Sequence, residues 1–375
     1  MRVVHIITGL NTGGAEMMLF KLLATIDRRR NEHHVISLLG YGTLGEKIKA
    51  LGIPIHILEL NHWAKWGCAP FSMVRLVRKI NPDLIQGWMY HGNLAASFVA
   101  LFQSFSLPVL WNIRQSLTDI AIEKRLTVFL IRVCALLSRY PARILYNSHI
   151  AAIQHEGLGY NSDKTVIIPN GFDIGQFKPD AQARISIRQS LGLAPDTQLI
   201  GLIARYHPMK DHDNFLQAAM LVCKKHSSAK FVLMGKDVDT SNRKIMSLLR
   251  KTMMEEQVFL LGERTDVAQI TAALDVAVNA SRGESFPNAI GEAMACGVPC
   301  VVTDVGDSAC IVGKTGKVVP PRNPVALAEA INDLLDLPFS ERDNFGNAAR
   351  LRIIEYFSIQ HVVSEYEGFY EGFVK

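Results

Sequence analysis

Two successive sets of short apolar segments, separated by amphipathic stretches, constrain the fold of this chain most strongly. Segments that are apolar on both faces and alternate with helices are typical of a parallel sheet covered by helices on both sides. The first set predicts such a doubly wound α/β domain over residues 1–170. Its strands are expected at Val3–Thr8, His34–Leu39, Ile53–Ile57, Leu84–Trp88, Val109–Asn112, Arg143–Tyr146 and Val166–Ile168.

The same alternation restarts after a break and predicts a second domain over residues 171–356. A Pro-Asn-Gly segment at 169–171 and the polar residues after it are typical of a linker between the two. A last helix, expected from Ile359 towards Phe369 within residues 357–375, is apolar along one side and must pack against another element. The second set of strands is expected at Leu199–Ala204, Lys230–Met234, Val258–Leu261, Asp275–Val278 and Pro299–Thr303, with helices such as Asp213–Val222 and Asn288–Ala295.

Composition and charge exclude several classes of protein. Hydrophobic residues make up 49% of the chain and charged residues 20%, which argues against disorder. The uncharged stretch Leu84–Ile113 contains Gly, His, Asn and Pro, so we interpret it as buried α/β structure and not as a membrane span. Met1 leads directly into the first strand without the regions of a secretory signal, and a cytoplasmic location is therefore expected.

The charge is distributed unevenly along the chain. Residues 1–170 carry 18 Lys and Arg against 10 Asp and Glu, a net +8, whereas residues 171–375 carry 22 against 25, a net −3. The basic half is compatible with a membrane surface, with a phosphate-bearing substrate or with an ordinary solvated surface, but it is too diffuse to indicate nucleic acid. Reduced, mostly buried thiols without zinc-site spacing are expected at Cys68, Cys134, Cys223, Cys296, Cys300 and Cys310.

The most specific motif is SRGESFPNAIGEAMACGVP at residues 281–299. It follows a predicted strand, opens a helix near Pro287 and closes that helix at Gly297. Glu284 then lies on the loop before the helix, and Glu292 lies within the helix. The free amides at the start of a helix can bind an anion, and carboxylates can accept hydrogen bonds from sugar hydroxyls. The spacing of the two glutamates alone would equally suit a solvated helix face.

Two further segments carry residues suited to binding phosphate. In GLIARYHPMKD, residues 201–211, a buried strand leads to Arg205 and to Lys210 on the following loop, where two cations can face a diphosphate. In GLNTGGAE, residues 9–16, Gly13 and Gly14 permit close approach of backbone amides to phosphate or sugar oxygens. These glycines lack the spacing of a dinucleotide-binding fingerprint.

Together these motifs resemble the retaining GT-B glycosyltransferases of family 4, over nearly the whole chain. The resemblance implies two Rossmann-like, doubly wound parallel-sheet domains facing a cleft, with a C-terminal helix that crosses back to the first domain. It also implies that Glu284 contacts the donor sugar and Glu292 the nucleotide ribose, and that Arg205 and Lys210 stabilise the leaving diphosphate. The other donor-binding residues that it implies are Gly13, Gly14, Ser285, Phe286, Pro287 and Asn288. Asp211 departs from the family, whose members commonly have glycine there.

Two residues are candidates for the acceptor side of the reaction. His91 lies just past a predicted strand end, where a lone histidine is often structural, but its place resembles that of the histidine that family members direct at the transferred sugar. Arg114 follows the strand that ends at Asn112 and is a second candidate, for contact with the acceptor or a phosphate.

The resemblance implies an enzyme that transfers a hexosyl or N-acetylhexosaminyl group from a nucleotide sugar, with UDP favoured, to a glycan or a lipid-diphosphate-linked acceptor. The setting that it implies is synthesis of cell-surface polysaccharide such as O-antigen or exopolysaccharide. No metal or other cofactor is expected, because Arg205 and Lys210 can supply the positive charge. Two alternatives stay open: a nucleotide-sugar epimerase or hydrolase of the same fold, and a non-catalytic nucleotide-sugar-binding subunit of an assembly complex.

Peripheral contact with the inner face of the plasma membrane is a further expectation. The predicted helix Arg125–Leu137 mixes arginines with apolar residues, as a helix bound at a membrane surface does. A helix buried in the core explains the same pattern equally well.

Overall fold

The structure, a computed structural model, describes the whole chain except residues 61–68, 104–106, 118–119, 121–123 and 374–375. It consists of two compact units: Met1–Gly171 with Ile359–Lys375 form unit 1, and Phe172–Ser358 form unit 2. The chain passes between the units after Gly171 and after Ser358, within two residues of the boundaries predicted after residues 170 and 356. Cys68 lies outside the described residues, and the five other cysteines are free thiols.

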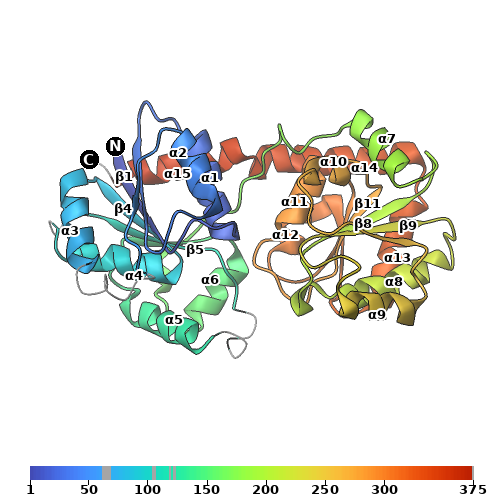
Figure 1. Ribbon diagram of the computed structural model, residues 1–375, viewed down its shortest axis with the longest axis horizontal. Helices are drawn as coiled ribbons and strands as arrows, with labels where there is room; N and C mark the ends of the chain where they lie inside the picture. Colours follow the sequence, from blue (N-terminus) through green and yellow to red (C-terminus); the bar gives the residue numbers. More distant parts are fainter. Residues whose placement is uncertain (61–68, 104–106, 118–119, 121–123, 374–375) are drawn as a thin grey trace. The chain divides into compact units, whose positions relative to one another are not determined.

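Unit 1 is built on a parallel seven-stranded sheet of order β3-β2-β1-β4-β5-β6-β7 (Figure 1). The strands are β1 (Arg2–Ile7), β2 (Glu32–Ser37), β3 (Ile55–Ile57), β4 (Leu84–Trp88), β5 (Val109–Ile113), β6 (Arg143–Tyr146) and β7 (Thr165–Ile167). The helices are α1 (Gly14–Thr25), α2 (Gly42–Ala50), α3 (Ala69–Ile80), α4 (Met89–Ala100), α5 (Arg125–Leu137), α6 (His149–Glu156), the short η3 (Ser162–Lys164) and α15 (Ile359–Glu371).

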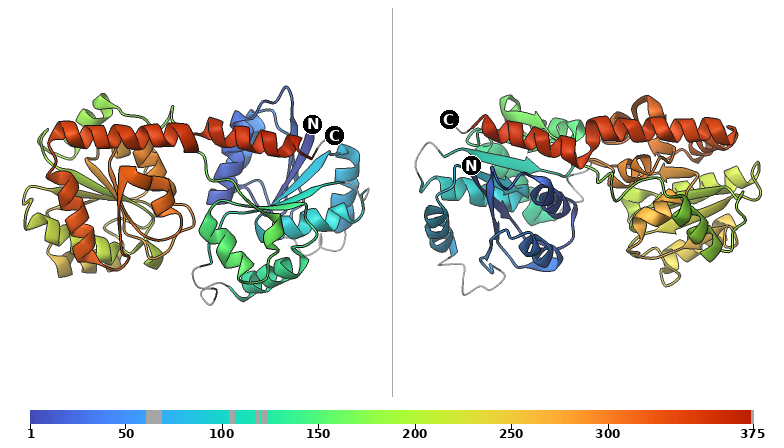
Figure 2. Two further views of the ribbon diagram at one scale, coloured as in Figure 1. Left: turned by 180° about the vertical axis from the view of Figure 1, so that it is seen from behind. Right: turned by 90° about the horizontal axis from the view of Figure 1, so that it is seen from above.

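The sheet of unit 1 has a hydrophobic core on each face because its strands are apolar on both sides. In β1, Val4 and Ile6 pack among the side chains of α3, α4, α5 and α6. Val3 and Ile7 point the other way and pack with α1, α2 and α15. The C-terminal helix α15 is thus part of the core of unit 1, where it contacts α1 (Figure 2).

Unit 2 repeats this architecture with a parallel six-stranded sheet of order β10-β9-β8-β11-β12-β13 (Figure 1). The strands are β8 (Leu199–Ile203), β9 (Lys230–Met234), β10 (Val258–Leu260), β11 (Val276–Asn279), β12 (Cys300–Thr303) and β13 (Gly316–Val319). The helices are α7 (Ala181–Ser190), η4 (Pro208–Lys210), α8 (His212–Cys223), α9 (Arg243–Thr252), α10 (Val267–Ala272), α11 (Asn288–Ala295), α12 (Ser308–Val312), η5 (Gly313–Thr315), α13 (Pro324–Leu335), α14 (Phe339–Arg352) and η6 (Ile353–Phe357).

The sequence did not predict strand β13. This strand is four residues long, pairs only with β12 and leaves Val318 41% exposed. A short edge strand of this kind lacks the apolar signal on both faces that marks the buried strands of the sheet.

The order of strands reverses once in each sheet, between β1 and β4 in unit 1 and between β8 and β11 in unit 2. At such a switch point the helices that follow the two neighbouring strands lie on opposite faces of the sheet, which leaves a crevice beyond the carboxyl ends of the strands. Ligands of open α/β sheets bind in this crevice. Each unit therefore has one topologically favoured place for a ligand.

Candidate functional site

The predicted donor residues of unit 2 gather at its switch point. Arg205 lies two residues beyond the end of β8, and Lys210 ends the short helix η4. Glu284 follows the adjacent strand β11, on the loop that leads to α11. A small pocket lies between these strand ends and the first turn of α11. Its lining residues are Leu202, Ile203, Ala204, Lys210, Val278, Asn279, Ala280, Ser281, Pro287, Asn288, Ala289 and Ile290.

Lys210 and Glu284 form an ion pair. The bonded Oε1 of Glu284 also accepts hydrogen bonds from Ser281 Oγ at 2.7 Å and from Asn279 Nδ2 at 3.3 Å. The side chain of Glu284 is only 11% exposed. Because three donors converge on one oxygen, the carboxylate is held in a fixed position, where charge-assisted bonds are strong.

A second ion pair joins the two loops that carry this pair. Arg282 donates from Nε and Nη2 to the two carboxylate oxygens of Asp211, at 2.7 and 2.6 Å. The Asp211 side chain is 2% exposed. In addition, the backbone N–H of Arg282 donates to the carbonyl of Met209 at 2.8 Å. The loop after β8 is therefore fastened to the loop after β11 directly beside Lys210 and Glu284.

The structure shows why this chain can have Asp211 where glycine is common in the family. Its backbone is left-handed, with φ 48° and ψ 53°, a conformation that glycine adopts freely and aspartate tolerates better than most residues. Its carboxylate caps α8 by accepting from the N–H of Asn214. Aspartate thus satisfies the same turn and adds the bond to Arg282.

Close packing fixes the loop that carries Glu284 from two sides. Gly306 has φ 58°, and a Cβ there would lie 2.4 Å from the carbonyl oxygen of Glu284. Phe286 is buried and stacks on Phe172 with ring centroids 6.0 Å apart. We had expected Phe286 to contact the donor, but its side chain is a core residue that anchors the loop.

The remaining predicted donor residues occupy the loop and the first turns of α11. Pro287 is the N-cap of this helix, Asn288 is its first residue, and Glu292 lies one turn further with a partly buried side chain. The carbonyl of Ser285 accepts a hydrogen bond from the N–H of Asp307 at 3.0 Å. Arg205 is exposed.

In unit 1, the glycine loop after β1 leads into α1 at the switch point. Gly13 is the N-cap of α1, and a Cβ there would meet the Glu16 carboxylate at 2.4 Å. Around Gly14 the space is open to 4 Å. Gly42, with φ 54°, packs so closely against the loop that a Cβ would lie 2.1 Å from the carbonyl carbon of Leu10. The loop therefore has a defined shape, with backbone accessible at Gly14.

His91 is placed on the other side of this switch point by a tight turn from β4 into α4. Met89 makes the turn in the left-handed region, with φ 61°, which is strained for a side chain of this kind. The helix then approaches β1 so closely that a Cβ on Gly92 would lie 2.3 Å from the carbonyl oxygen of Ile6. His91 is exposed, and desolvation lowers the pKa of its imidazole, which is therefore mainly neutral at pH 7.

Arg114, a candidate for contact with the acceptor or a phosphate, has a structural role in unit 1, and its contact with a ligand stays a prediction. Its guanidinium is buried and donates to Asn170 Oδ1, to Asn112 Oδ1 and to the hydroxyl of Tyr366, the last at 2.9 Å. Burial lowers the pKa of this guanidinium. The bonds connect β5, the end of the first segment of unit 1 and α15, so Arg114 holds the C-terminal helix in place.

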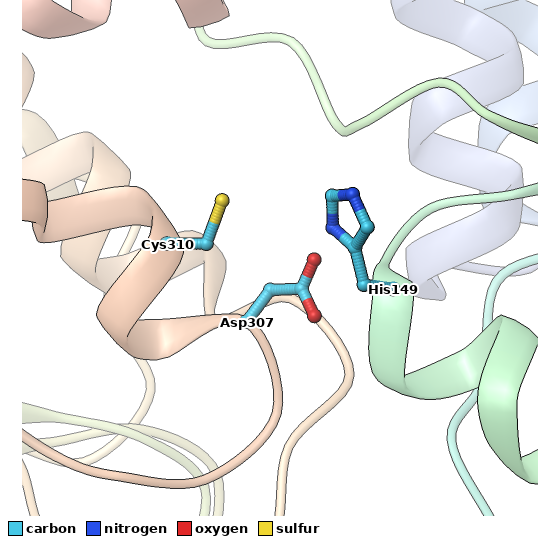
Figure 3. Close-up of side chains that lie close together, drawn as sticks. All are labelled: His149, Asp307 and Cys310. Atoms are coloured by element: carbon cyan, nitrogen blue, oxygen red, sulfur yellow. The ribbon is translucent and has the colours of Figure 1, made fainter.

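Figure 3 draws three side chains of types that bind metals. His149 is the first residue of α6 in unit 1, whereas Asp307 and Cys310 lie before and within α12 in unit 2. Because the residues belong to different units, we assign them to no common site. The absence of a metal requirement stays a prediction.

Sequence comparisons agree with the geometry of both units. Residues 12–176 match the family model described as "Glycosyltransferase Family 4", and residues 197–337 match the model described as "Glycosyl transferases group 1". The two matches cover all the predicted donor residues, and the second covers both strands of the switch point of unit 2. The chain belongs to the family 4 glycosyltransferases.

Curated relatives of this glycosyltransferase include enzymes with different substrates. EpsF of Bacillus subtilis strain 168, which carries a provisional glycosyltransferase name, is 23% identical over 81% of this chain and 79% of its own length. The UDP-Gal:α-D-GlcNAc-diphosphoundecaprenol α-1,3-galactosyltransferase of Escherichia coli is 30% identical over 40% of this chain and 39% of its own. The N-acetyl-α-D-glucosaminyl L-malate synthase of Bacillus anthracis is 28% identical, and the match spans about half of each chain (49% and 48%).

Solved structures share the GT-B fold of this enzyme. Anabaena HepE in complex with UDP-glucose matches 99% of both chains, with a TM-score of 0.83 and 19% sequence identity. A glycosyltransferase from Rickettsia africae matches 100% of this chain and 98% of its own, with a TM-score of 0.80 and 16% identity. Among the residues that the structure describes, no helix is both long and apolar enough to cross a membrane.

Proposed function

We propose that the enzyme is a retaining glycosyltransferase that moves a hexosyl or N-acetylhexosaminyl group from a UDP-sugar to a lipid-diphosphate-linked glycan, in cell-surface polysaccharide synthesis. The observation that carries the proposal is the Lys210–Glu284 ion pair at the switch point of unit 2. Such a pair offers one cation for a diphosphate and one carboxylate for sugar hydroxyls within a single site. Support for the substrates comes from the galactosyltransferase of E. coli, whose name gives a UDP-sugar donor and a diphosphoundecaprenol acceptor, and from UDP-glucose bound to HepE.

In this proposal, binding of the donor breaks the ion pair between Lys210 and Glu284. Lys210 turns to the diphosphate together with Arg205, and Glu284 accepts a hydrogen bond from a hydroxyl of the sugar. Negative charge grows on the diphosphate as the glycosidic bond breaks, and fixed cations stabilise this charge more in the transition state than in the ground state. Glu292 accepts from the ribose. Without the donor, Lys210 and Glu284 neutralise each other, which avoids unpaired charge at a partly buried site.

We assign binding of the acceptor to unit 1. The acceptor hydroxyl attacks the anomeric carbon from the face that the nucleotide leaves, and its proton passes to a phosphate oxygen, so that the configuration is retained. His91 faces the transferred sugar as a neutral imidazole, able to donate or accept a hydrogen bond. The backbone at Gly14 supplies amides close to the same ligands.

Product analysis with a radiolabelled UDP-sugar and a lipid-diphosphate-linked acceptor tests this function. We expect transfer that depends on added acceptor, and a product whose anomeric configuration, read by NMR, matches that of the donor. Loss of sugar from the donor without acceptor would instead indicate a hydrolase, and interconversion of the donor an epimerase. Tight binding of UDP without turnover by the purified protein would indicate the non-catalytic subunit.

We also propose that unit 1 contacts the cytoplasmic face of a membrane through helix α5. Three apolar side chains of this helix point to solvent: Leu126 is 64% exposed, Phe129 61% and Leu136 72%. Arg125, just before Leu126, and Arg132, between Phe129 and Leu136, are also exposed. A helix face that combines aromatic, aliphatic and basic side chains suits the interface of a bilayer with anionic lipids, such as those of a cytoplasmic leaflet.

Sedimentation with lipid vesicles tests this contact. We expect the enzyme to bind vesicles that contain an anionic lipid more strongly than zwitterionic vesicles, and Phe129→Ser to weaken the binding severalfold. Met253→Ser is the matched control, because Met253 is 79% exposed beside the basic residues Arg250 and Lys251 of α9. Equal loss of binding in both variants would contradict a specific role of α5.

A further inference from the structure

An apolar cavity of about 670 Å³ lies in unit 1. It is bounded by the segments just past the carboxyl ends of β1, β2 and β3 and by the helices α3, α4 and α5, which succeed one another on one face of the sheet (Figure 1). Its lining residues are Thr8, Leu38, Leu39, Leu58, Leu60, Pro70, Met73, His91, Leu94, Ala95, Phe98, Leu126 and Leu130. The volume falls within the range of roughly 300–1,000 Å³ that is usual for ligand pockets.

The lining determines what kind of ligand the cavity can hold. Among the described residues that line it, none carries a charged side chain, and only Thr8 and His91 have polar side chains. Water gains few hydrogen bonds in such a space and a polar ligand would lose those it makes in solution, so an apolar ligand is favoured.

The polar part of the lining connects the cavity to the candidate acceptor site. Thr8 directly follows β1, and His91 lies in the first turn of α4 after β4. These two strands are neighbours, with Ile7 paired to Trp88 at their ends. The cavity therefore begins at the switch point of unit 1 and continues among apolar side chains beneath the three helices.

The surroundings of the cavity suit a ligand that also carries negative charge. Over their full sequences α3, α4 and α5 contain no Asp or Glu. Arg75 of α3 and Arg125 of α5 are exposed, and Arg125 directly precedes the lining residue Leu126. One acidic residue, Glu59, stands between the lining residues Leu58 and Leu60. An apolar cavity between helices that carry no carboxylate, two of which carry arginine, is complementary to a molecule that combines a hydrocarbon chain with phosphate.

We propose that this cavity binds the hydrocarbon chain of the lipid phosphate that carries the acceptor sugar, so that the head of the acceptor is held at His91. The inference rests on the proposed function, because it names the part of unit 1 that selects its lipid acceptor. Affinity should then rise with chain length, by up to about fourfold for each methylene buried, until the cavity is full.

Calorimetric titration with prenyl phosphates of increasing length tests the proposal without donor or turnover. Dimethylallyl, geranyl and farnesyl phosphate carry the same head group, and each is used below its critical micelle concentration. We expect farnesyl phosphate to bind at least about tenfold more tightly than dimethylallyl phosphate. Affinities that do not depend on chain length would overturn the proposal.

Two substitutions in α4 and one after β2 test whether the preference for longer chains arises in the cavity. Ala95→Phe fills part of the cavity and should abolish the preference for the longer chain, whereas Ala100→Phe makes the same change on the same helix outside the lining and should preserve it. Leu39→Asn adds a polar amide to the lining at a residue that is already 43% exposed, and it provides a second test if Ala95→Phe does not fold. A preference for long chains that survives both lining substitutions would refute the assignment.

Two outcomes distinguish binding of the chain in the cavity from binding of the same face to a bilayer and from failure of the proposed function. Loss of vesicle binding in Ala95→Phe and Leu39→Asn, with the preference for longer soluble prenyl phosphates unchanged, would show that the face binds a bilayer and that the cavity does not take the chain. Preference for long chains without sugar transfer to any lipid-linked acceptor would refute the proposed function and leave the cavity assignment standing.

Discussion

The two switch points of the molecule are organised in different ways. In unit 2, charged side chains hold one another: Lys210 pairs with Glu284, and Arg282 pairs with Asp211. In unit 1, the described residues around Gly14 and His91 are positioned by close backbone packing, and the adjacent cavity is apolar. In the proposed function, unit 2 binds the charged diphosphate of the donor, whereas the apolar cavity of unit 1 binds the hydrocarbon chain of the acceptor. The comparison predicts that unit 2 responds most to changes of charge and unit 1 to changes of volume.

The largest effect is expected at the Lys210–Glu284 pair. Lys210→Met or Glu284→Gln should lower the rate of transfer by roughly 10²–10³-fold, because each removes a preorganised group that faces charge or hydroxyls of the donor. The double variant should lose more than either single one, since in the proposed function the two residues contact different parts of the bound donor. Steady-state kinetics with saturating acceptor would measure both effects.

The control for this experiment is Lys225→Met. Lys225 also forms an ion pair, with Asp336, but both side chains are about half exposed (56% and 43%). Exposed pairs contribute little to stability, and this one lies away from the switch point, so transfer should be unchanged. A comparable loss of activity in Lys225→Met would mean that the effect at Lys210 is not specific to the site.

Acid should destabilise unit 1 more than unit 2. Burial lowers the pKa of His33 and of His155 to about 4 in unit 1, and that of His212 to about 4 in unit 2. The pKa of the fully buried His5 is also lowered, by burial and by His33. Between pH 6.5 and 4 the unfolded chain binds more protons than the folded one, so stability is complete above pH 6.5 and falls as the pH decreases. Each of the three histidines with a pKa of about 4 contributes up to about 1.4 kcal/mol per pH unit within this window.

Tryptophan fluorescence can observe unit 1 alone. All four tryptophans precede residue 112, and Trp88 and Trp111 are fully buried. The urea midpoint from fluorescence should fall between pH 7 and pH 5 by more than the midpoint of the circular dichroism signal, to which both units contribute. Equal shifts of the two midpoints would contradict the predicted difference between the units.

The sequence predicted most of the fold because the strands are apolar on both faces and the helices are periodic. The helices Arg125–Leu137 and Asn288–Ala295 have the predicted bounds. The motifs also indicated which charged residues lie together, since Lys210 and Glu284 form an ion pair, and their roles toward the donor stay a prediction. The burial of the Phe286 side chain could not be predicted, because membership of a motif does not determine whether a side chain points to the ligand or to the core.

Residues that act through tertiary contacts could not be predicted. Arg282 is one arginine on a loop, and only the fold places it against Asp211. Gly42 and Gly306 are needed because other segments approach them closely, which no local pattern records. The apolar cavity combines short pieces of six secondary-structure regions, so its residues are scattered between 8 and 130. The positive φ of Asp211 is the one feature that the comparison with the family's glycine could have indicated.

A larger side chain at position 92 should destabilise unit 1. In Gly92→Ala the new Cβ would lie 2.3 Å from the carbonyl oxygen of Ile6, so α4 must move away from β1, at a cost of about 1–3 kcal/mol of unfolding free energy. Gly14→Ala is the matched control, because the space around Gly14 is open. It should leave the urea midpoint unchanged and raise the KM for substrate if backbone at Gly14 approaches a ligand. Equal stability of the Gly92→Ala variant and the wild type would show that α4 adapts freely.

The smallest effect is expected for Arg282→Lys, which keeps the charge but loses the two parallel bonds to Asp211. We expect the KM for the donor to rise about tenfold, with kcat and the KM for the acceptor nearly unchanged, because the loop that carries Glu284 is less well positioned. Arg264→Lys is the matched control in the same unit, since Arg264 binds Asp266 in the same two-bond arrangement, at 2.8 and 2.6 Å, away from the switch point. An unchanged KM for the donor in Arg282→Lys would mean that the link between the loops supports the fold of unit 2 and not the donor site.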